Sequence, residues 1–246
     1  MYVKTRALVL RVIDYNDRDC LLSLLTWDQG KITVKARGLR RKNSRISAAC
    51  QLLAYGEFTL FEQYGRYVID EAVAIDLFRE LRDDLNKLSL ATYFAQVADV
   101  MSQEDMPSLE LLPLVLNCLY GLSRLNVPDL LIKSVFELRA ACLAGFMPDL
   151  SGCRECGDEF PSMLDLSGGY MLCDSCRNAA TGIRYPVGLG ALNAMRYISH
   201  CEPKKLFAFY LNEEGIQQLS GLTEAYLTTQ FERGFSALDF YKSLLT

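Results

Sequence analysis

Four of the nine cysteines in this chain of 246 residues occur as two closely spaced pairs. Two residues separate Cys153 from Cys156, two separate Cys173 from Cys176, and 16 residues lie between the pairs. Each pair can fold as a tight turn with both sulfurs directed at one ion, and four thiolates suit the tetrahedral geometry of Zn²⁺. The alternatives are two disulfides, a chance pairing, or cysteines with a structural iron or a redox role. Because four thiolates leave no open coordination position, we expect one zinc ion with a structural role.

The remaining residues do not match a catalytic centre. His200 is the only histidine, and with Cys201 and Glu202 it forms an H-x-E motif. In the zinc deaminase signature this motif precedes a P-C-x-x-C pair, whereas here it follows both cysteine pairs. The sequence also contains neither a P-loop nor a G-x-G-x-x-G motif for binding phosphates. We therefore expect a protein that is not an enzyme.

Residues 31–45 form a strongly basic stretch without any acidic residue. If residues 31–37 are a strand, its two-residue period puts their cations on one face and apolar residues on the other. Cations along a groove neutralise phosphates, and exposed aromatic rings stack on unpaired bases. The candidate nucleic-acid contacts are Lys31, Lys35, Arg37, Arg40, Arg41, Lys42 and Arg45, with Tyr15 and Trp27 as stacking residues. The alternative is a solvated charged loop with the aromatic rings in the core.

The charge of the chain is unevenly distributed. Residues 1–66 contain 12 lysines and arginines against 6 acidic residues, although the whole chain has a net charge of −4. The first 66 residues therefore carry +6 and the rest −10. This asymmetry indicates that the N-terminal part meets a polyanion.

The elements that must position these residues follow from periodicity and turn signals. Five strands, expected at 3–13, 20–26, 31–37, 57–62 and 67–75, favour an OB-type barrel, with an SH3-like barrel as the alternative. Helical periodicity is expected at 77–88, 109–122, 129–144, 189–199, 203–210, 213–232 and 237–245. The fold class is α+β, with an OB-fold domain at 1–76, a helical domain at 77–150 and 180–246, and an inserted zinc module at 151–179. No apolar run is long enough to cross a membrane, and no secretion signal precedes the first strand, so we expect a cytoplasmic protein.

Several short motifs, in this order and spacing, resemble the bacterial recombination mediator family RecO. They are Lys-Ala-Arg-Gly at 35–38, Phe-Glu-Leu-Arg at 136–139, Gly-Phe at 145–146 and Gly-Tyr-Met-Leu-Cys at 169–173, together with the cysteine pairs. The resemblance covers essentially the whole chain. It implies binding to single- and double-stranded DNA, annealing of complementary strands without ATP, and a location at the nucleoid. It also implies partnership with RecR and the single-strand-binding protein, so that RecA loads on covered DNA.

The helix expected at 129–144 has two interpretations. Its periodicity is typical of a core helix with cations on the far side. The family resemblance instead implies a groove that receives the acidic tail of single-strand-binding protein, with Lys133, Phe136 and Arg139 as candidate contacts. For the whole protein the alternative function is an RNA-binding or protein-interaction adaptor in transcription or translation, since backbone charge and stacking serve DNA and RNA alike.

Overall fold

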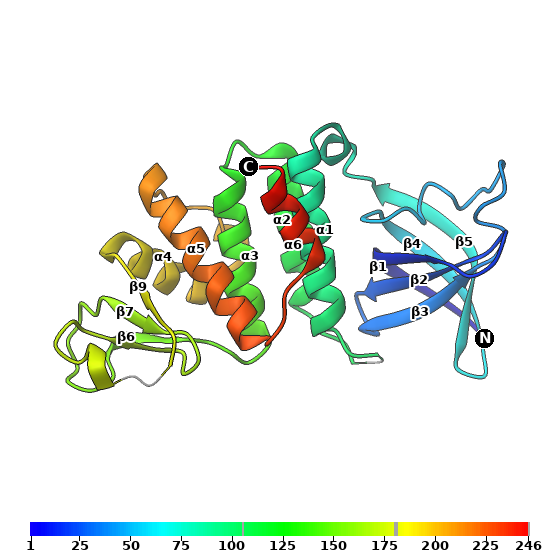
Figure 1. The fold of residues 1–246 in the computed structure, drawn as a ribbon. Coiled ribbons are helices and arrows are strands. Elements are labelled where there is room, and N and C mark those ends of the chain that lie inside the picture. Colours follow the sequence, from blue (N-terminus) through cyan, green and yellow to red (C-terminus); the bar gives the residue numbers. More distant parts are fainter. Residues whose placement is uncertain (105, 180–181, 246) are drawn as a thin grey trace. The chain divides into compact units, whose positions relative to one another are not determined.

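The computed structural model describes residues 1–104, 106–179 and 182–245 (Figure 1). The chain divides into two compact units, Met1–Arg124 with the segment from Phe235 onward, and Leu125–Gly234. The first unit contains β1 (Tyr2–Asp14), β2 (Cys20–Thr26), β3 (Lys31–Ala36), β4 (Tyr55–Gln63), β5 (Arg66–Asp76), α1 (Leu85–Met101), α2 (Leu111–Arg124) and α6 (Ser236–Ser243). The second contains α3 (Asp129–Leu143), β6 (Asp149–Cys153), β7 (Met163–Asp165), β8 (Tyr170–Leu172), β9 (Arg184–Pro186), α4 (Leu189–His200) and α5 (Glu213–Gln230).

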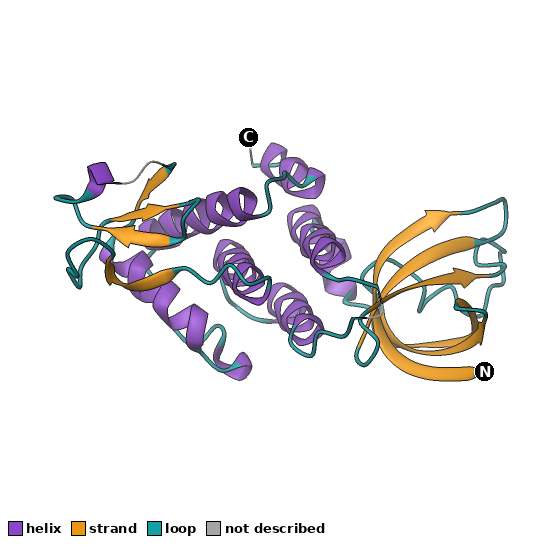
Figure 2. Cartoon of the chain, turned by 90° about the horizontal axis from the view of Figure 1, so that it is seen from below, coloured by secondary structure: helices purple, strands orange, loops and turns teal. Residues whose placement is uncertain are grey.

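The first five strands close into a barrel in the order β1-β2-β3-β5-β4, which Figure 2 shows in orange. Neighbouring strands are antiparallel except β3 and β5, which pair in parallel through Val34 with Tyr67 and Lys35 with Val68. Apolar and polar residues alternate along β3, so that Ile32, Val34 and Ala36 point into the barrel and are buried in its core. The α+β class with an N-terminal five-stranded OB barrel is thus confirmed.

Helices α1 and α6 pack together in the first unit, where the ring centres of Tyr93 and Phe235 are 5.5 Å apart. The expected helical run at 77–88 is wrong in its first part. Asp84 has an extended backbone, and its carboxylate accepts hydrogen bonds from the N–H groups of Asn86 and Lys87. A short carboxylate at this position satisfies N–H groups that a helix start leaves unpaired. The α-helix therefore begins after Asp84, and only a 3₁₀ turn, Arg79–Asp83, precedes it.

In the second unit α3, α4 and α5 pack on one another, beside a four-stranded sheet in the order β6-β8-β7-β9. The helix expected at 203–210 is wrong, because the structure has only the 3₁₀ turn Pro203–Lys205 there. The hydroxyl of Tyr197 donates to the backbone oxygen of Lys205 at 2.8 Å. In an α-helix that oxygen would accept from the N–H of Phe209, whose ring instead packs against Tyr197.

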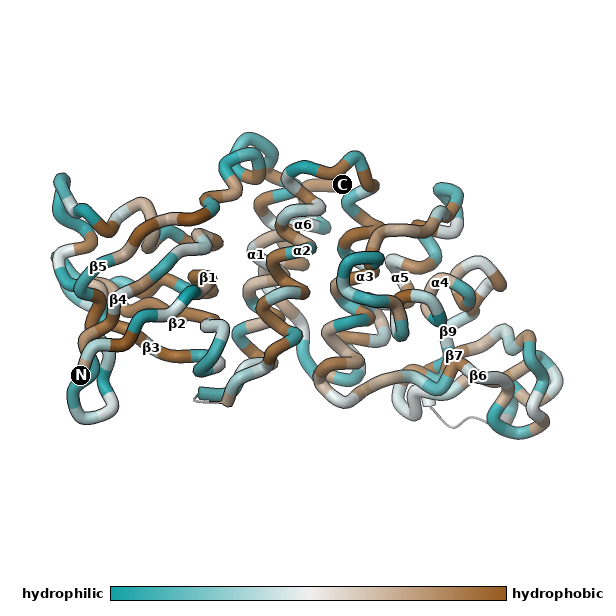
Figure 3. Tube along the Cα trace, turned by 180° about the vertical axis from the view of Figure 1, so that it is seen from behind, coloured by the Kyte–Doolittle hydropathy of each residue, from teal (hydrophilic) through white to brown (hydrophobic). Residues whose placement is uncertain are grey.

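The predicted domain boundaries remain predictions. The second helical segment is expected at 180–246, and its residues 180, 181 and 246 lie outside the described residues. Figure 3 shows hydrophobic and hydrophilic residues alternating along the helices, as expected where one face of a helix is buried. Every helix in the described part of the chain is too short or too polar to span a lipid bilayer.

Candidate nucleic-acid interface and metal centre

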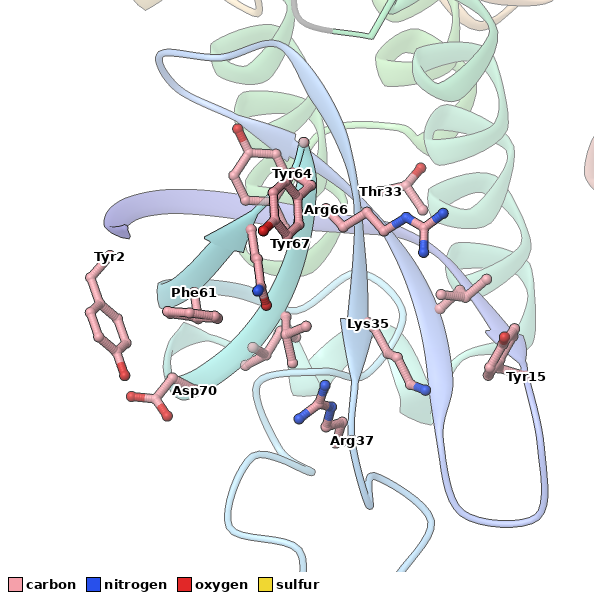
Figure 4. A pocket seen from close by; sticks show the side chains of 15 residues that line it. Tyr2, Tyr15, Thr33, Lys35, Arg37, Phe61, Tyr64, Arg66, Tyr67 and Asp70 are labelled. Atoms are coloured by element: carbon pink, nitrogen blue, oxygen red, sulfur yellow. The ribbon is translucent and has the colours of Figure 1, made fainter.

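A groove of about 1200 Å³ runs over the outside of the barrel (Figure 4). Its floor is the outward face of β3, and its flanks are the loop after β1 and the hairpin between β4 and β5. The outward residues of β3 and the residue that follows the strand supply Thr33, Lys35 and Arg37. These are the face and the loops through which OB-folds hold oligonucleotides.

Lys35 lies at the centre of this groove and is held on two sides. Its ammonium nitrogen is 3.0 Å from a carboxylate oxygen of Asp19 and 4.6 Å from the centre of the Tyr15 ring. The N–H of Gly38 donates to Asp19, and this bond, together with Lys35, lowers the pKa of Asp19 to about 2. Tyr15 is 59% exposed, so it stays accessible to a ligand. The structure thus brings the predicted residues Tyr15 and Lys35 together.

The basic loop after β3 continues the same surface. A second hollow of about 420 Å³ is lined by Arg41 and Arg45 and shares Arg37, Ile69 and Asp70 with the groove. Lys42 is exposed in the same loop. Within the described ranges, no carboxylate forms an ion pair with the side chains of Arg37, Arg41, Lys42 or Arg45. Their charges are therefore available to a polyanion.

Three of the predicted contacts lie in other surroundings. Arg40 has no acidic neighbour in the sequence of the loop, but the fold brings Asp14 of β1 to 3.0 Å from it, which corrects the expectation of a loop without neutralising acids. Lys31 turns towards α1, where its ammonium donates to the backbone oxygen of Asp99 and pairs with the carboxylate of Asp99. Trp27 is 49% exposed but lines a separate hollow with Lys4 and Arg6. Their contact with DNA stays a prediction.

The structure adds residues to the groove that the sequence analysis missed. Tyr2, Phe61, Tyr64 and Arg66 line it, and Figure 4 shows the aromatic side chains on the flank formed by β1, β4 and β5. Tyr2 reaches this flank because β1 pairs with β4 in the register Tyr2 with Phe61. The sequence carries a signal for Tyr64, since an aromatic residue before a turn glycine is exposed by the turn, but it carries none for Tyr2.

The four paired cysteines meet in the second unit. Their sulfur atoms all lie within 4.8 Å of one another, and those of Cys156 and Cys173 are 3.6 Å apart. Cys153 ends β6, and its backbone oxygen accepts from the N–H of Gly157, which adopts the left-handed conformation with φ 76°. The second pair follows β8, and the N–H of Cys176 donates to the oxygen of Cys173. A hairpin at Gly168 and Gly169 joins β7 to β8 and returns the chain to the cluster.

The thiols of this cluster are arranged to hold a cation. Burial opposes ionisation of Cys153, but the N–H groups of Cys173, Cys156 and Glu155 direct hydrogen bonds at its sulfur and lower its pKa to about 6. Further ionisation is opposed, because the neighbouring sulfurs of Cys173 and Cys156 raise the pKa of Cys176 to about 12. A divalent cation removes this repulsion, since the thiolate is the form that binds metal.

The sulfur positions also fit a tetrahedral ion. Sulfur atoms bonded at 2.3 Å to one zinc ion are about 3.8 Å apart, close to the separation of Cys156 and Cys173. All nine cysteines are free thiols in the structure, so the cluster is not a pair of disulfides. The four-cysteine cluster that could hold a metal ion is confirmed.

The candidate partner site on α3 is a core segment. The side chain of Lys133 is 1% exposed and lies between the carboxylates of Glu137, at 3.0 Å, and Glu224, at 2.9 Å. Phe136 is fully buried, and Arg139 donates to the backbone oxygens of Ile198 and Ser199. The expectation that Lys133 and Phe136 flank an exposed groove is therefore corrected, because neither side chain reaches the surface.

Comparison with known proteins agrees with this architecture over nearly the full chain. Residues 1–78 match the family described as Recombination protein O N terminal, and residues 82–239 match Recombination protein O C terminal. A protein of Acetivibrio thermocellus named DNA repair protein RecO is 32% identical over 99% of this chain and 97% of its own length. Proteins of the same name are 28% identical in Symbiobacterium thermophilum, covering 96% of this chain and 95% of their own, and 27% identical in Thermoanaerobacter, covering 98% of both. The barrel, the cysteine cluster and these matches lead to one conclusion: the chain belongs to the RecO family of DNA repair proteins.

Proposed function

We propose that this protein is a recombination mediator that binds single- and double-stranded DNA and anneals complementary strands without ATP. One observation carries the proposal: Arg37, Arg41 and Arg45, which have no carboxylate partner in the described chain, line a surface continuous with a groove that is flanked by exposed aromatic rings. Membership of the RecO family supports DNA as the polyanion.

The mechanism requires charge and no chemical step. Two strands repel each other through their phosphates, and cations that neutralise these phosphates release condensed counterions and lower the repulsion. Arg37, Arg41 and Arg45 supply such cations along one continuous surface. Bases that contact the protein only through stacking keep their pairing edges free, so that a complementary strand can join. We infer that the protein is not an enzyme.

The wider role follows the family resemblance. We propose RecR and the single-strand-binding protein as partners, with RecA loaded as the outcome, in the cytoplasm at the nucleoid. Since Lys133 is buried, the acidic tail of single-strand-binding protein needs a different contact surface from the one expected on α3. We propose zinc as the metal of the cysteine cluster, with the structural role of holding its two turns together.

Charge reversal in the groove tests the DNA-binding surface. In Arg37→Glu with Arg41→Glu, affinity for single strands should fall, and the slope of log affinity against log salt should become shallower by about 0.7 for each phosphate that is no longer neutralised. The measurement is a salt titration of fluorescently labelled oligomers. Lys204→Glu with Lys205→Glu is the matched control, because it reverses two exposed charges outside the barrel. An equal effect of both double changes would place the DNA surface outside this groove.

The same proteins should be compared in an annealing assay without nucleotide and with matched RNA oligomers. The wild type should anneal complementary DNA, and the variant with Arg37→Glu and Arg41→Glu should lose annealing together with single-strand binding. Tighter binding to RNA than to DNA, without annealing, would instead favour an RNA-binding adaptor.

A further inference from the structure

The hairpin between β4 and β5 has an unusual tip. Only Tyr64 and Gly65 connect the two strands, and both have positive φ, 53° and 71°. Positive φ at both central residues is characteristic of a type I′ turn, in which Asn-Gly or Asp-Gly is the favoured pair. The turn is well anchored, because Gln63 pairs with Arg66 across the ladder and Glu62 accepts a hydrogen bond from the N–H of Gly65.

The fold does not need an aromatic side chain at this place. Glycine, which has no Cβ atom, adopts the left-handed conformation readily. Other residues do so at a cost in free energy, which is lowest for asparagine and aspartate. The side chain of Tyr64 is 92% exposed, so burial of its ring does not offset this cost. A strained backbone position that carries a large exposed ring points to a use outside folding.

The position of Tyr64 suggests what that use is. Its side chain lines the groove, together with Phe61 and Tyr2, whose rings lie 5.4 Å apart. Figure 4 shows these aromatic side chains on the flank formed by β1, β4 and β5, while Lys35 and Arg37 lie along the floor formed by β3 and the residue after it. The groove thus has aromatic rings on one flank and cations on its floor, which match the bases and the phosphates of one unpaired strand.

We propose that Tyr64 stacks on an unpaired base and thereby makes the groove prefer single-stranded to duplex DNA. The proposal rests on the proposed function and assigns this preference to the hairpin tip. In a duplex the bases are stacked on one another and their faces are covered, so only the phosphates reach the protein. A single strand offers both uncovered base faces and phosphates, so it contacts the ring of Tyr64 as well as the cations.

The substitution Tyr64→Asn separates this role from folding. Asparagine suits the turn, so the free energy of unfolding should stay equal or rise. Affinity for a single strand should fall about tenfold, the loss expected for one stacked base, while duplex affinity and the salt slope stay unchanged. Tyr64→Phe keeps the ring and should bind as the wild type does.

Fluorescence reports the stacking directly. Trp27 is the only tryptophan, so Trp27→Phe with Tyr64→Trp leaves a single reporter at the hairpin tip. A single strand should quench this emission strongly, while a duplex should change it little, because stacking on a base quenches indole.

The outcomes distinguish the two proposals. If the wild type binds both DNA forms and Tyr64→Asn binds single strands equally well, stacking by Tyr64 is overturned and the recombination mediator proposal stands. If Tyr64→Asn lost affinity equally for single strands and for duplex, the proposal for Tyr64 would also be overturned, because the ring would then not distinguish the two forms of DNA. If the wild type binds neither form of DNA, the proposed function itself fails.

Discussion

Asp19 links the groove to the basic loop through one carboxylate. One of its oxygens accepts from the N–H of Gly38, and the other lies 3.0 Å from the ammonium of Lys35. Gly38 has φ 64°, so the chain turns there from β3 into the loop that contains Arg41 and Arg45. Asp19 therefore helps to fix the direction in which the loop with Arg41 and Arg45 extends from the barrel.

We predict that Asp19→Asn reduces the acid sensitivity of the protein. The pKa of Asp19 in the folded state, about 2, lies below the value of about 3.9 for an unfolded chain. Ionised Asp19 thus stabilises the fold above about pH 4, and this contribution disappears as the pH falls towards 2. Urea unfolding at pH 5 and pH 3 measures it: the wild type should lose more stability between these values than Asp19→Asn.

Asp17→Asn is the control for this experiment, because Asp17 is an exposed carboxylate of the same loop. It should respond to pH as the wild type does. Equal pH sensitivity of the wild type and both variants would contradict a special role of Asp19.

At the scale of elements, the two cysteine turns join short strands, and Arg196 of α4 and Gln230 of α5 donate hydrogen bonds to backbone oxygens of this segment. The strands β7, β8 and β9 have three residues each, and around the cluster the core consists of Cys153, Leu172 and Cys173 with a few partly buried neighbours. So small a core stabilises little by burial alone. A metal ion held by the four thiolates would add the stability that this small core does not supply.

We predict that Cys173→Ser releases the metal and loosens the strands β6 to β9. The change should lower zinc content, measured by elemental analysis of reduced protein, from one ion per chain to none. Hydrogen exchange should speed up in β6 to β9 and leave the barrel unchanged. Cys201→Ser, at a thiol outside the cluster, should keep the zinc, and native protein without zinc would contradict the structural metal.

The contact between α3 and α5 depends on a buried charge. Lys133 pairs with Glu137 and Glu224 and donates to the hydroxyl of Ser220, and Thr223 donates to Glu137. Burial alone would lower the pKa of Lys133, but the two carboxylates raise it above its ordinary value, so the ammonium stays charged. Such a network joins the two helices in one register.

We predict that Lys133→Met lowers the free energy of unfolding by about 3–5 kcal/mol, because it leaves the fully buried Glu137 without its cation. Lys133→Met with Glu137→Gln should be more stable than the single variant, since the unpaired charge is then absent. Lys205→Met removes an exposed pair with Glu202 and should change stability little. Chemical denaturation compares all three, and similar destabilisation in Lys133→Met and Lys205→Met would contradict a buried network.

Features set by neighbouring residues were predictable from the sequence. The two-residue period of β3 identified its buried and exposed faces, and the spacing of the cysteines identified the cluster. Features that depend on which strands pair were not predictable. Tyr2 and Tyr64 line one groove only through the register of β1 with β4, and Asp14 comes within 3.0 Å of Arg40 only once β2 pairs with both β1 and β3.

Local periodicity also fails where a side chain competes for the backbone. Apolar spacing through residues 77–88 and 203–210 is helical, but Asp84 and Tyr197 take up hydrogen-bonding groups that a continuous α-helix would use. For Lys133 the periodicity was the better guide, since it indicated a core helix, and the family resemblance indicated a docking groove.

At the scale of the whole molecule, the first compact unit is discontinuous in sequence. Its barrel is complete by Asp76, but α6 joins α1 only after the chain has passed through all of the second unit. The ring of Phe235, at the start of α6, packs on Tyr93 and is 3% exposed.

This arrangement imposes an order on biosynthesis. A ribosome makes the chain from the N-terminus, and domains fold as they emerge. The barrel can close while later segments are still being translated, whereas α1 waits, with the side of Tyr93 uncovered, for more than one hundred further residues until α6 arrives. During that interval the nascent chain carries an apolar helix face that a chaperone can recognise, while the groove on its barrel is already formed.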